Sequence, residues 1–181
     1  MCRRLVAQGG FVIAADQNED ALQDLARDTP ERIAPLVLDM SDTRALRRLC
    51  DTWSGEPLHL LIMAHPLHEN LLLDHVLAST AEVTSALAEV ISAANGAAVL
   101  IFRAAESGSP ATAHAVTEAL SALTRELAGA GSRINALALQ DQALSPQMAE
   151  RVCTTALMMA LPMAAAVRGA VLPVGLASAH P

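Results

Sequence analysis

The sequence contains no tyrosine and no lysine, and other aromatic residues are scarce, with two phenylalanines and one tryptophan among 181 residues. The absence of tyrosine and lysine excludes any catalytic site that uses a phenol as proton donor with an ammonium group to lower its pKa. Hydrophobic residues nevertheless make up 52% of the chain. The core must therefore be built from alanine, leucine, valine and methionine rather than from large rings.

Positive charge is also scarce, because the formal net charge is −7 and all 12 cationic residues are arginines. The arginines are scattered rather than arranged in a stripe, which argues against a nucleic-acid-binding surface. The cysteines Cys2, Cys50 and Cys153 are odd in number and lack CxxC spacing. They predict neither a disulfide framework nor a zinc knuckle, and they favour the reducing cytoplasm as the location.

No segment has the character of a signal peptide or a membrane span. The apolar N-terminal stretch is short and is soon followed by acidic residues, from Asp16 onward. The most apolar window, residues 152–167, is interrupted by Pro162 and is shorter than the roughly 20 residues that a span needs. No linker or repeat divides the chain, so we predict one domain over residues 1–181.

Apolar runs of strand length alternate with segments of helical periodicity along the chain. This alternation predicts an α/β fold with a doubly wound, mostly parallel, Rossmann-like sheet. The expected strands are residues 11–15, 33–38, 58–64, 97–103, 134–139 and 170–174. The expected helices are residues 1–8, 18–28, 41–50, 74–94, 111–130 and 150–161, with N-caps at Asn18 and Ser41.

The most informative stretch runs from Ser109 to Leu139, where an amphipathic helix, a turn at Gly129 and Gly131, and a buried strand follow one another. Its phrase LTRELA…G-x-RINALA resembles the short-chain dehydrogenase/reductase family, in which this helix begins with a catalytic Tyr-x-x-x-Lys pair and the strand begins R-[VI]-N. The segments RRLVAQGGFVIAADQ, LVLDMSD, LHLLIMAHP and VRGAVLPVG resemble further family segments in the family order. The resemblance therefore covers almost the whole chain, although no single motif is intact.

The resemblance places the family's catalytic pair on residues that lack its chemistry. Aligned through ELAGAGSRIN, the tyrosine falls on Ser109 and the lysine on Ala113; aligned through LTR, they fall on Ala113 and Thr117. The family's N-N-A-G motif is replaced by MAHP at residues 63–66, and only residues 140–149 remain where the family has a substrate lid. We therefore predict that the chain has no catalytic residues.

The family's first strand and its T-G-x-x-x-G-x-G loop have no counterpart in the chain. That loop binds the cofactor's pyrophosphate through backbone N–H groups and a helix N-terminus, so we expect no cofactor to bind the chain as it stands. The lost strand is the central one, so two groups of strands must either pair across a gap or accept a strand from outside. Alternatively, the start site is mis-assigned and lies about 20–30 residues upstream, the length of such a unit, in which case NAD(P) could bind.

Two acidic residues are candidates for remnants of a nucleotide site. Asp16 follows an expected strand at the point where NAD-selective members of the family use an acid against the ribose hydroxyl. Asp39 lies in LVLDMSD, where the family aspartate lies near the adenine. Each has an alternative, purely structural interpretation as a helix-entry residue.

Two further groups of polar residues could carry other chemistry. His114 and Glu118 are four residues apart on one helix, a spacing that allows contact, and histidine can act as an acid or base near neutral pH. His114 misses the family tyrosine position in both alignments, so we interpret the two residues as a partly solvated surface pair. The densest set of possible metal ligands does not match a closed zinc pattern, so we predict no metal site and interpret the set as a polar loop. Its members are His65, His68, Glu69, Asp74 and His75.

The helices expected at residues 79–94 and 111–130 are rich in alanine, and small residues allow helices to approach closely. In the family, the same two helices pack against their counterparts in another subunit. The resemblance therefore implies a homo- or hetero-oligomer through these helices. The scattered arginines and the lack of a membrane span predict no nucleic-acid and no membrane partner. Our leading hypothesis is a catalytically degenerate relative that serves as a structural or regulatory subunit. The alternative is an NAD(P)-dependent oxidoreductase of this family whose N-terminus is mis-assigned.

Overall fold

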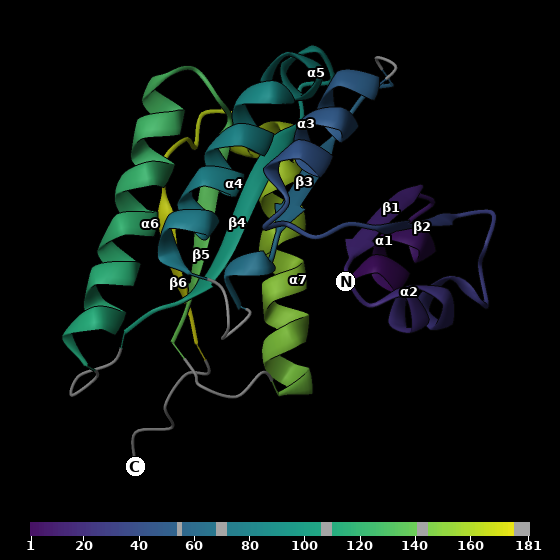
Figure 1. The fold of residues 1–181 in the computed structure, drawn as a ribbon, viewed down its shortest axis with the longest axis horizontal. Helices are drawn as coiled ribbons and strands as arrows, with labels where there is room; N and C mark the ends of the chain where they lie inside the picture. The colour runs from purple at the N-terminus through teal and green to yellow at the C-terminus, as the bar shows by residue number, and fades with distance from the viewer. Residues whose placement is uncertain (54–55, 68–71, 106–109, 141–144, 176–181) are drawn as a thin grey trace.

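The computed structural model describes residues 1–53, 56–67, 72–105, 110–140 and 145–175, and it confirms the α/β fold (Figure 1). Helices and strands alternate, and each pair of neighbouring strands is parallel, as predicted. The strands are β1 (Val12–Asp16), β2 (Ile33–Val37), β3 (Leu60–Met63), β4 (Ala97–Arg103), β5 (Ile134–Leu139) and β6 (Val171–Val174). The helices are α1 (Cys2–Ala7), α2 (Glu19–Ala26), α3 (Thr43–Thr52), α4 (Leu73–Ala86), α5 (Ala88–Ala93), α6 (Ala111–Gly129) and α7 (Pro146–Ala160), with short 3-10 turns η1 (His65–Leu67) and η2 (Pro162–Ala164).

The strands form two separate sheets rather than one continuous sheet. Four strands pair in the order β3-β4-β5-β6, and β1 pairs with β2 alone. In the described part of the chain no strand joins the two sheets. The gap that we expected from the sequence is therefore present in the fold.

The four-stranded sheet is covered on both faces. Helices α3, α4 and α6 lie on one face and α7 lies on the other (Figure 1). Side chains of α3, α4 and α6 pack against Leu100 and Phe102, and those of α7 pack against Val99 and Ile101. Because alternate residues of a strand point to opposite faces, β4 must be apolar at successive positions. Six of the seven residues of β4 and all six of β5 are buried, which explains their uninterrupted apolar sequences.

The two-stranded sheet has a small core of its own, in which Leu22, Ala26 and Ile33 are buried together. It is linked to the rest of the molecule by the chain that follows β2, where Leu38 enters the main core, and by an ion pair between Arg4 of α1 and Glu150 of α7. Figure 1 shows this unit lying beyond β3, on the side of the large sheet away from β6.

Two side chains of the RIN phrase, Arg133 and Asn135, hold the start of β5 in place. Arg133 donates hydrogen bonds to the carbonyls of Asn95 and Gly96 before β4, and to those of Met159 and Leu161 at the end of α7, over 2.7–3.3 Å. Asn135 is fully buried; its amide donates to the carbonyl of Val167 at 2.9 Å and accepts from the N–H of Ala170 at 3.0 Å. In this protein the arginine and asparagine of the phrase hold three elements and a loop together.

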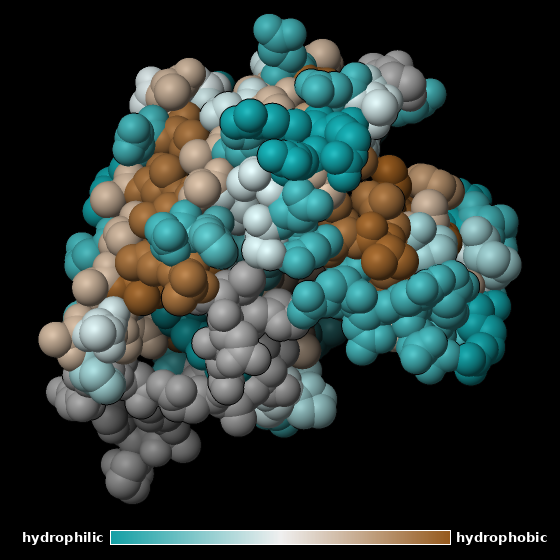
Figure 2. Space-filling view, viewed as in Figure 1, coloured by the Kyte–Doolittle hydropathy of each residue, from teal (hydrophilic) through white to brown (hydrophobic). Residues whose placement is uncertain are grey.

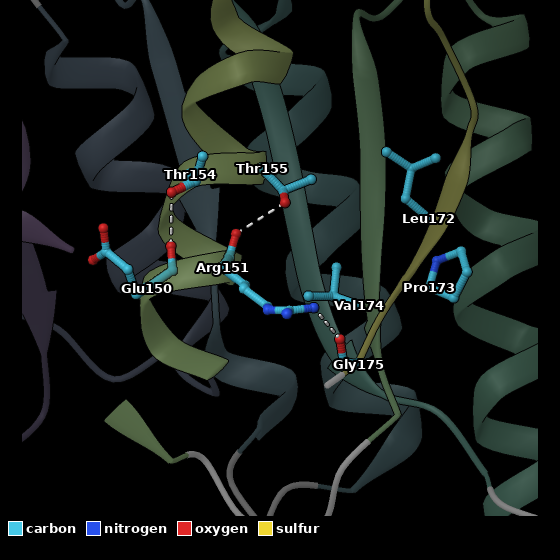
Figure 3. A pocket seen from close by; sticks show the side chains of 8 residues that line it. All are labelled: Glu150, Arg151, Thr154, Thr155, Leu172, Pro173, Val174 and Gly175. Atoms are coloured by element: carbon cyan, nitrogen blue, oxygen red, sulfur yellow. Dashed lines mark hydrogen bonds between the residues drawn. The ribbon is translucent and has the colours of Figure 1, made fainter. Parts of the chain in front are cut away.

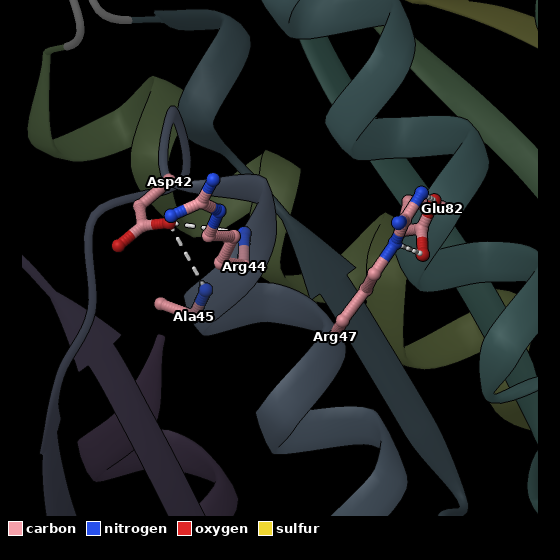
Figure 4. Close-up of polar contacts among 5 residues, drawn as sticks. All are labelled: Asp42, Arg44, Ala45, Arg47 and Glu82. Carbon is pink, nitrogen blue, oxygen red and sulfur yellow. Dashed lines mark hydrogen bonds and ion pairs between the residues drawn. The ribbon is translucent and has the colours of Figure 1, made fainter.

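Three expected helix limits differ from the structure. The N-cap of α3 is Asp42, which accepts from the N–H groups of Arg44 and Ala45 (Figure 4). Ser41, the expected cap, instead hydrogen-bonds Asp39. Helix α7 begins at Pro146 rather than at residue 150, because Ser145 caps it and proline suits the first helical position. The helix expected over residues 74–94 is broken at Leu87, where the chain turns so that α5 packs on β4. None of the described helices is long and apolar enough to span a membrane.

An ion pair joins α3 to α4, since Arg47 Nε donates to Glu82 Oε1 at 2.8 Å (Figure 4). The hydrogen bond from Arg47 lowers the pKa of Glu82 below its ordinary value of 4.5. A depressed carboxyl pKa contributes stability above the unfolded pKa, and that stability is lost as the pH falls through the folded pKa. We expect Glu82→Gln to lower Tm by about 1–2 °C at pH 7 and by less at about pH 3. Thermal unfolding at both pH values measures this, with Glu89→Gln on α5 as the control. An equal loss at both pH values would contradict the ion-pair explanation.

Candidate functional site

Hydrogen-bonded polar side chains lie near the carboxyl ends of β3 and β4, where a functional site is expected in a parallel sheet of this kind. His65, in η1 directly after β3, is 8% exposed, and its Nε2 lies 3.0 Å from Ser79 Oγ and 3.2 Å from Thr80 Oγ1 on α4. Ser79 Oγ also donates to the carbonyl of Val76 at 3.2 Å. Which group donates to which depends on the histidine tautomer. Because Ser79 and Thr80 are at most 1% exposed, the arrangement anchors α4 to η1 and does not present a nucleophile to solvent.

Thr117 places a hydroxyl at one of the positions where the sequence alignment puts the family lysine. Thr117 Oγ1 on α6 donates to the carbonyl of Ala113 at 3.1 Å and accepts from the N–H of Ala105 at 2.8 Å. It therefore ties α6 to the chain that leaves β4. Ala113, the alternative position for the lysine, carries only a methyl group, and Ser109 lies outside the described residues.

The two acidic residues singled out from the sequence lie in separate turns. Asp16 Oδ1 accepts from the N–H of Asn18 at 2.9 Å, and Asn18 in turn caps α2. Asp39 Oδ1 accepts from the N–H of Ser41 at 2.8 Å and from its hydroxyl at 2.7 Å. The Ser41 N–H above all, then the hydroxyl and the charge of His75, lower the pKa of Asp39. Both carboxylates shape turns, and a role for either against a nucleotide stays a prediction.

The remaining sequence candidates are spread over the surface. His114 and Glu118 are both exposed on α6, and Asp74 and His75 are exposed in the first turn of α4. His68 and Glu69 lie outside the described residues. Among the residues that the structure describes, no three histidine, cysteine, aspartate or glutamate side chains lie close enough together to hold a metal ion.

The sequence did not point to an open hollow of about 500 Å³ between α7 and β6 (Figure 3). Arg151 reaches across it and donates to the carbonyl of Gly175 at 2.9 Å. The hydroxyls of Thr154 and Thr155 bond carbonyls of their own helix at 2.9 Å each. These three side chains each make a hydrogen bond within the protein, and the exposed surface of the hollow is mainly apolar.

Solved structures with the same arrangement of elements identify the fold. A short-chain dehydrogenase/reductase family protein superposes with a TM-score of 0.74 at 17% identity, over 96% of this chain and 88% of its own. The chain has the short-chain dehydrogenase/reductase fold. A candidate 3-oxoacyl-reductase from Bacillus thuringiensis (TM-score 0.71, 15% identity, 96% of this chain and 89% of its own) and an apo SCOR enzyme from Clostridium thermocellum (0.70, 16%, 96% and 84%) are similar to it in the same way. No protein-family model and no curated protein matches the sequence.

This fold implies a nicotinamide cofactor, so the described residues can be tested for the phosphate-binding feature that such a cofactor needs. A glycine-rich turn between a strand and the next helix lets backbone N–H groups approach the pyrophosphate. No described glycine lies between a strand and the helix that follows it: Gly9, Gly96, Gly131 and Gly169 all precede strands. The described residues therefore do not fit this cofactor in the usual way.

Proposed function

We propose that this protein is a non-catalytic structural or regulatory subunit with the short-chain dehydrogenase/reductase fold. One observation carries the proposal: where the alignment puts the catalytic pair, the chain has Ser109, Ala113 and Thr117, and Thr117 is committed to two backbone hydrogen bonds. Without a phenol and an ammonium group, the usual proton transfer that accompanies hydride transfer has no donor. His65 is buried, and its Nε2 contacts the hydroxyls of Ser79 and Thr80 on α4.

The pairing surface that we propose is the outer side of α4 and α6. On α6, Ala115, Ala122 and Gly129 are exposed and recur every seven residues, and on α4 the exposed Ala78 and Ser85 have the same spacing. Such spacing places small residues in one row along a helix, where a second helix can approach closely. Figure 2 shows hydrophobic surface along α6, on the face that carries these helices. The partner is another chain of this fold or a second copy.

A single substitution tests the pairing surface. We expect Ala122→Arg to weaken self-association, or association with a co-expressed full-length protein of this fold, by about 100-fold or more, because an arginine in a helix interface is buried without a partner. Ala21→Arg on α2 is the matched control, since Ala21 is also exposed on a helix. Size-exclusion chromatography with light scattering measures both. A wild-type chain that stays monomeric alone and with such partners would refute the proposed pairing.

The enzymatic alternative is tested directly with the cofactor. We expect purified protein to leave the fluorescence of NADH and NADPH unchanged and to show no oxidoreductase activity above a protein-free blank. Saturable binding that is lost in Asp16→Ala or Asp39→Ala would instead favour an NAD(P)-dependent oxidoreductase and would make those residues part of its site. We also propose a cytoplasmic location, because the three cysteines are free thiols.

A further inference from the structure

The two sheets have four edge strands, β1, β2, β3 and β6, and these edges differ in their capacity to accept another strand. We define the outer edges as the free sides of β2 and β6, and the inner edges as the free sides of β1 and β3. In a parallel pair, the backbone groups of every second residue point to the neighbouring strand and those of the residues between point away. Hydrogen bonds between strands therefore reveal which residues offer N–H and C=O groups at each edge.

Both outer edges carry a proline at an outward-pointing position. Val12 N–H donates to the carbonyl of Arg32 at 2.8 Å, so the backbone groups of even-numbered residues of β2 point to β1 and those of Pro35 point outward. Likewise Gln140 N–H donates to the carbonyl of Val174 at 2.9 Å, so Pro173 points outward on β6. Proline has no N–H, so at such a position it removes a donor that an added strand would need and weakens pairing there.

Both inner edges keep their complete set of donors and acceptors. The same parity directs the backbone groups of Ile13 and Ala15 away from β2. On β3, the bond from Ala97 N–H to the carbonyl of His59 directs Leu60 and Ile62 away from β4. No proline lies in β1 or β3, and in the described part of the chain no strand pairs with either edge. Each outer edge is therefore interrupted by a proline, whereas neither inner edge is.

The surface next to β1 is apolar where an edge exposed to water would be expected to be polar. Phe11 is 62% exposed, Ile13 46% and Val37 55%, and Figure 2 shows hydrophobic residues gathered over β1 and β2. The unit that carries them lies on the β3 side of the large sheet (Figure 1). Open strand edges that carry apolar side chains are sites where another chain adds as a strand.

We infer that the inner edges of β1 and β3 form a receptor for one extended strand contributed by a second, different polypeptide, which would join the two sheets. Every described strand already pairs in one of the two sheets, so none of the described residues, in this chain or in a second copy, supplies a free strand. A strand between β1 and β3 would be buried on both faces, as β4 and β5 are. The occupant is therefore aliphatic at successive positions, free of proline and about five residues long. This surface is separate from the α4–α6 face, so the inference goes beyond the proposed function and holds if that pairing fails.

A peptide and two proline variants test the inference. The probe is a synthetic peptide of about eight residues with a Val-Ile-Val-Val core and charged ends, added to the full chain. We expect Ile13→Pro to weaken binding by about tenfold or more, because it removes one outward N–H from an inner edge. Val37→Pro removes an outward N–H from an outer edge at a comparably exposed position and should change binding less than about twofold.

Amide hydrogen exchange in the unmodified protein keeps the test independent of the variants. Bound peptide should slow exchange about tenfold or more at Ile13, Ala15, Leu60 and Ile62, and leave the outward amide of Val37 unchanged. Absence of binding, protection at only one inner edge, or equal effects of Ile13→Pro and Val37→Pro would overturn the inference. So would a dimer of the chain alone that Ile13→Pro dissociates, because the occupant would then be a second copy.

Discussion

Replacing Gly96 with alanine is expected to destabilise the protein by about 3 kcal/mol or more, because the added methyl group has no room beside the backbone of a neighbouring strand. A Cβ at this position would lie 2.3 Å from the carbonyl oxygen of Leu58 and 2.8 Å from that of His59. Both are backbone atoms leading into β3, so relief requires β3 to move away from β4. For a chain of this size the loss corresponds to a fall in Tm of roughly 6–12 °C.

The matched control is Gly129→Ala at the end of α6, where a Cβ would meet no atom within 4 Å. Alanine suits a helix better than glycine, so this variant should be neutral or gain up to about 1 kcal/mol. Urea and thermal unfolding of the two variants beside the wild type measure the difference. If Gly96→Ala unfolds at the same midpoint as Gly129→Ala, the close approach of β3 to residue 96 is wrong.

Removing the Arg133 side chain is expected to cost about 2–4 kcal/mol, because one guanidinium donates to four carbonyls, two before β4 and two at the end of α7. The bonds to Asn95 and Gly96 hold the start of β4, and those to Met159 and Leu161 bind the carboxyl end of α7, where backbone carbonyls lack helical partners. In Arg133→Ala these acceptors lose a charged donor, which is worth more than a neutral hydrogen bond. Thermal unfolding should show the loss together with earlier fraying of α7.

Two comparison variants separate geometry from charge. Arg133→Lys keeps the charge but replaces the planar fork with a single ammonium, so we expect it to recover less than about half of the loss. Arg168→Ala removes an exposed arginine from the loop before β6 and should stay within about 0.5 kcal/mol of the wild type. Full recovery in Arg133→Lys would show that charge alone matters and would contradict a role for the fork geometry.

Much of the fold could be predicted from local patterns. Strands β4 and β5 agree with the prediction residue for residue, because a continuous apolar run bounded by polar residues is what a strand buried on both faces requires. The limits of α3 could not be decided in the same way, since Ser41 and Asp42 are both good capping residues. Only the competing bond between Ser41 and Asp39 decides that Asp42 caps the helix. The start of α7 is signalled by Ser145 and Pro146, so the predicted start at residue 150 was wrong although the local sequence marks the true one.

The candidate site was less predictable, because its contacts join residues distant in sequence. His65 meets Ser79 and Thr80 only because α4 returns over η1, and no spacing of 14 or 15 residues predicts that. Asp16 and Asp39 could be singled out from their positions after strands, but their local bonds to Asn18 and Ser41 became evident only in the structure.

The sequence by itself determined the parallel α/β fold and the absence of the phenol and ammonium chemistry, because side-chain periodicity and residue identity are local properties. Only the tertiary structure decided that the strands divide into two sheets, and that Pro35 and Pro173 lie on the outer edges while β1 and β3 remain open. Whether a backbone N–H points toward a neighbouring strand or toward a free edge depends on which strands pair and in which register. The sequence of a single strand does not determine that pairing.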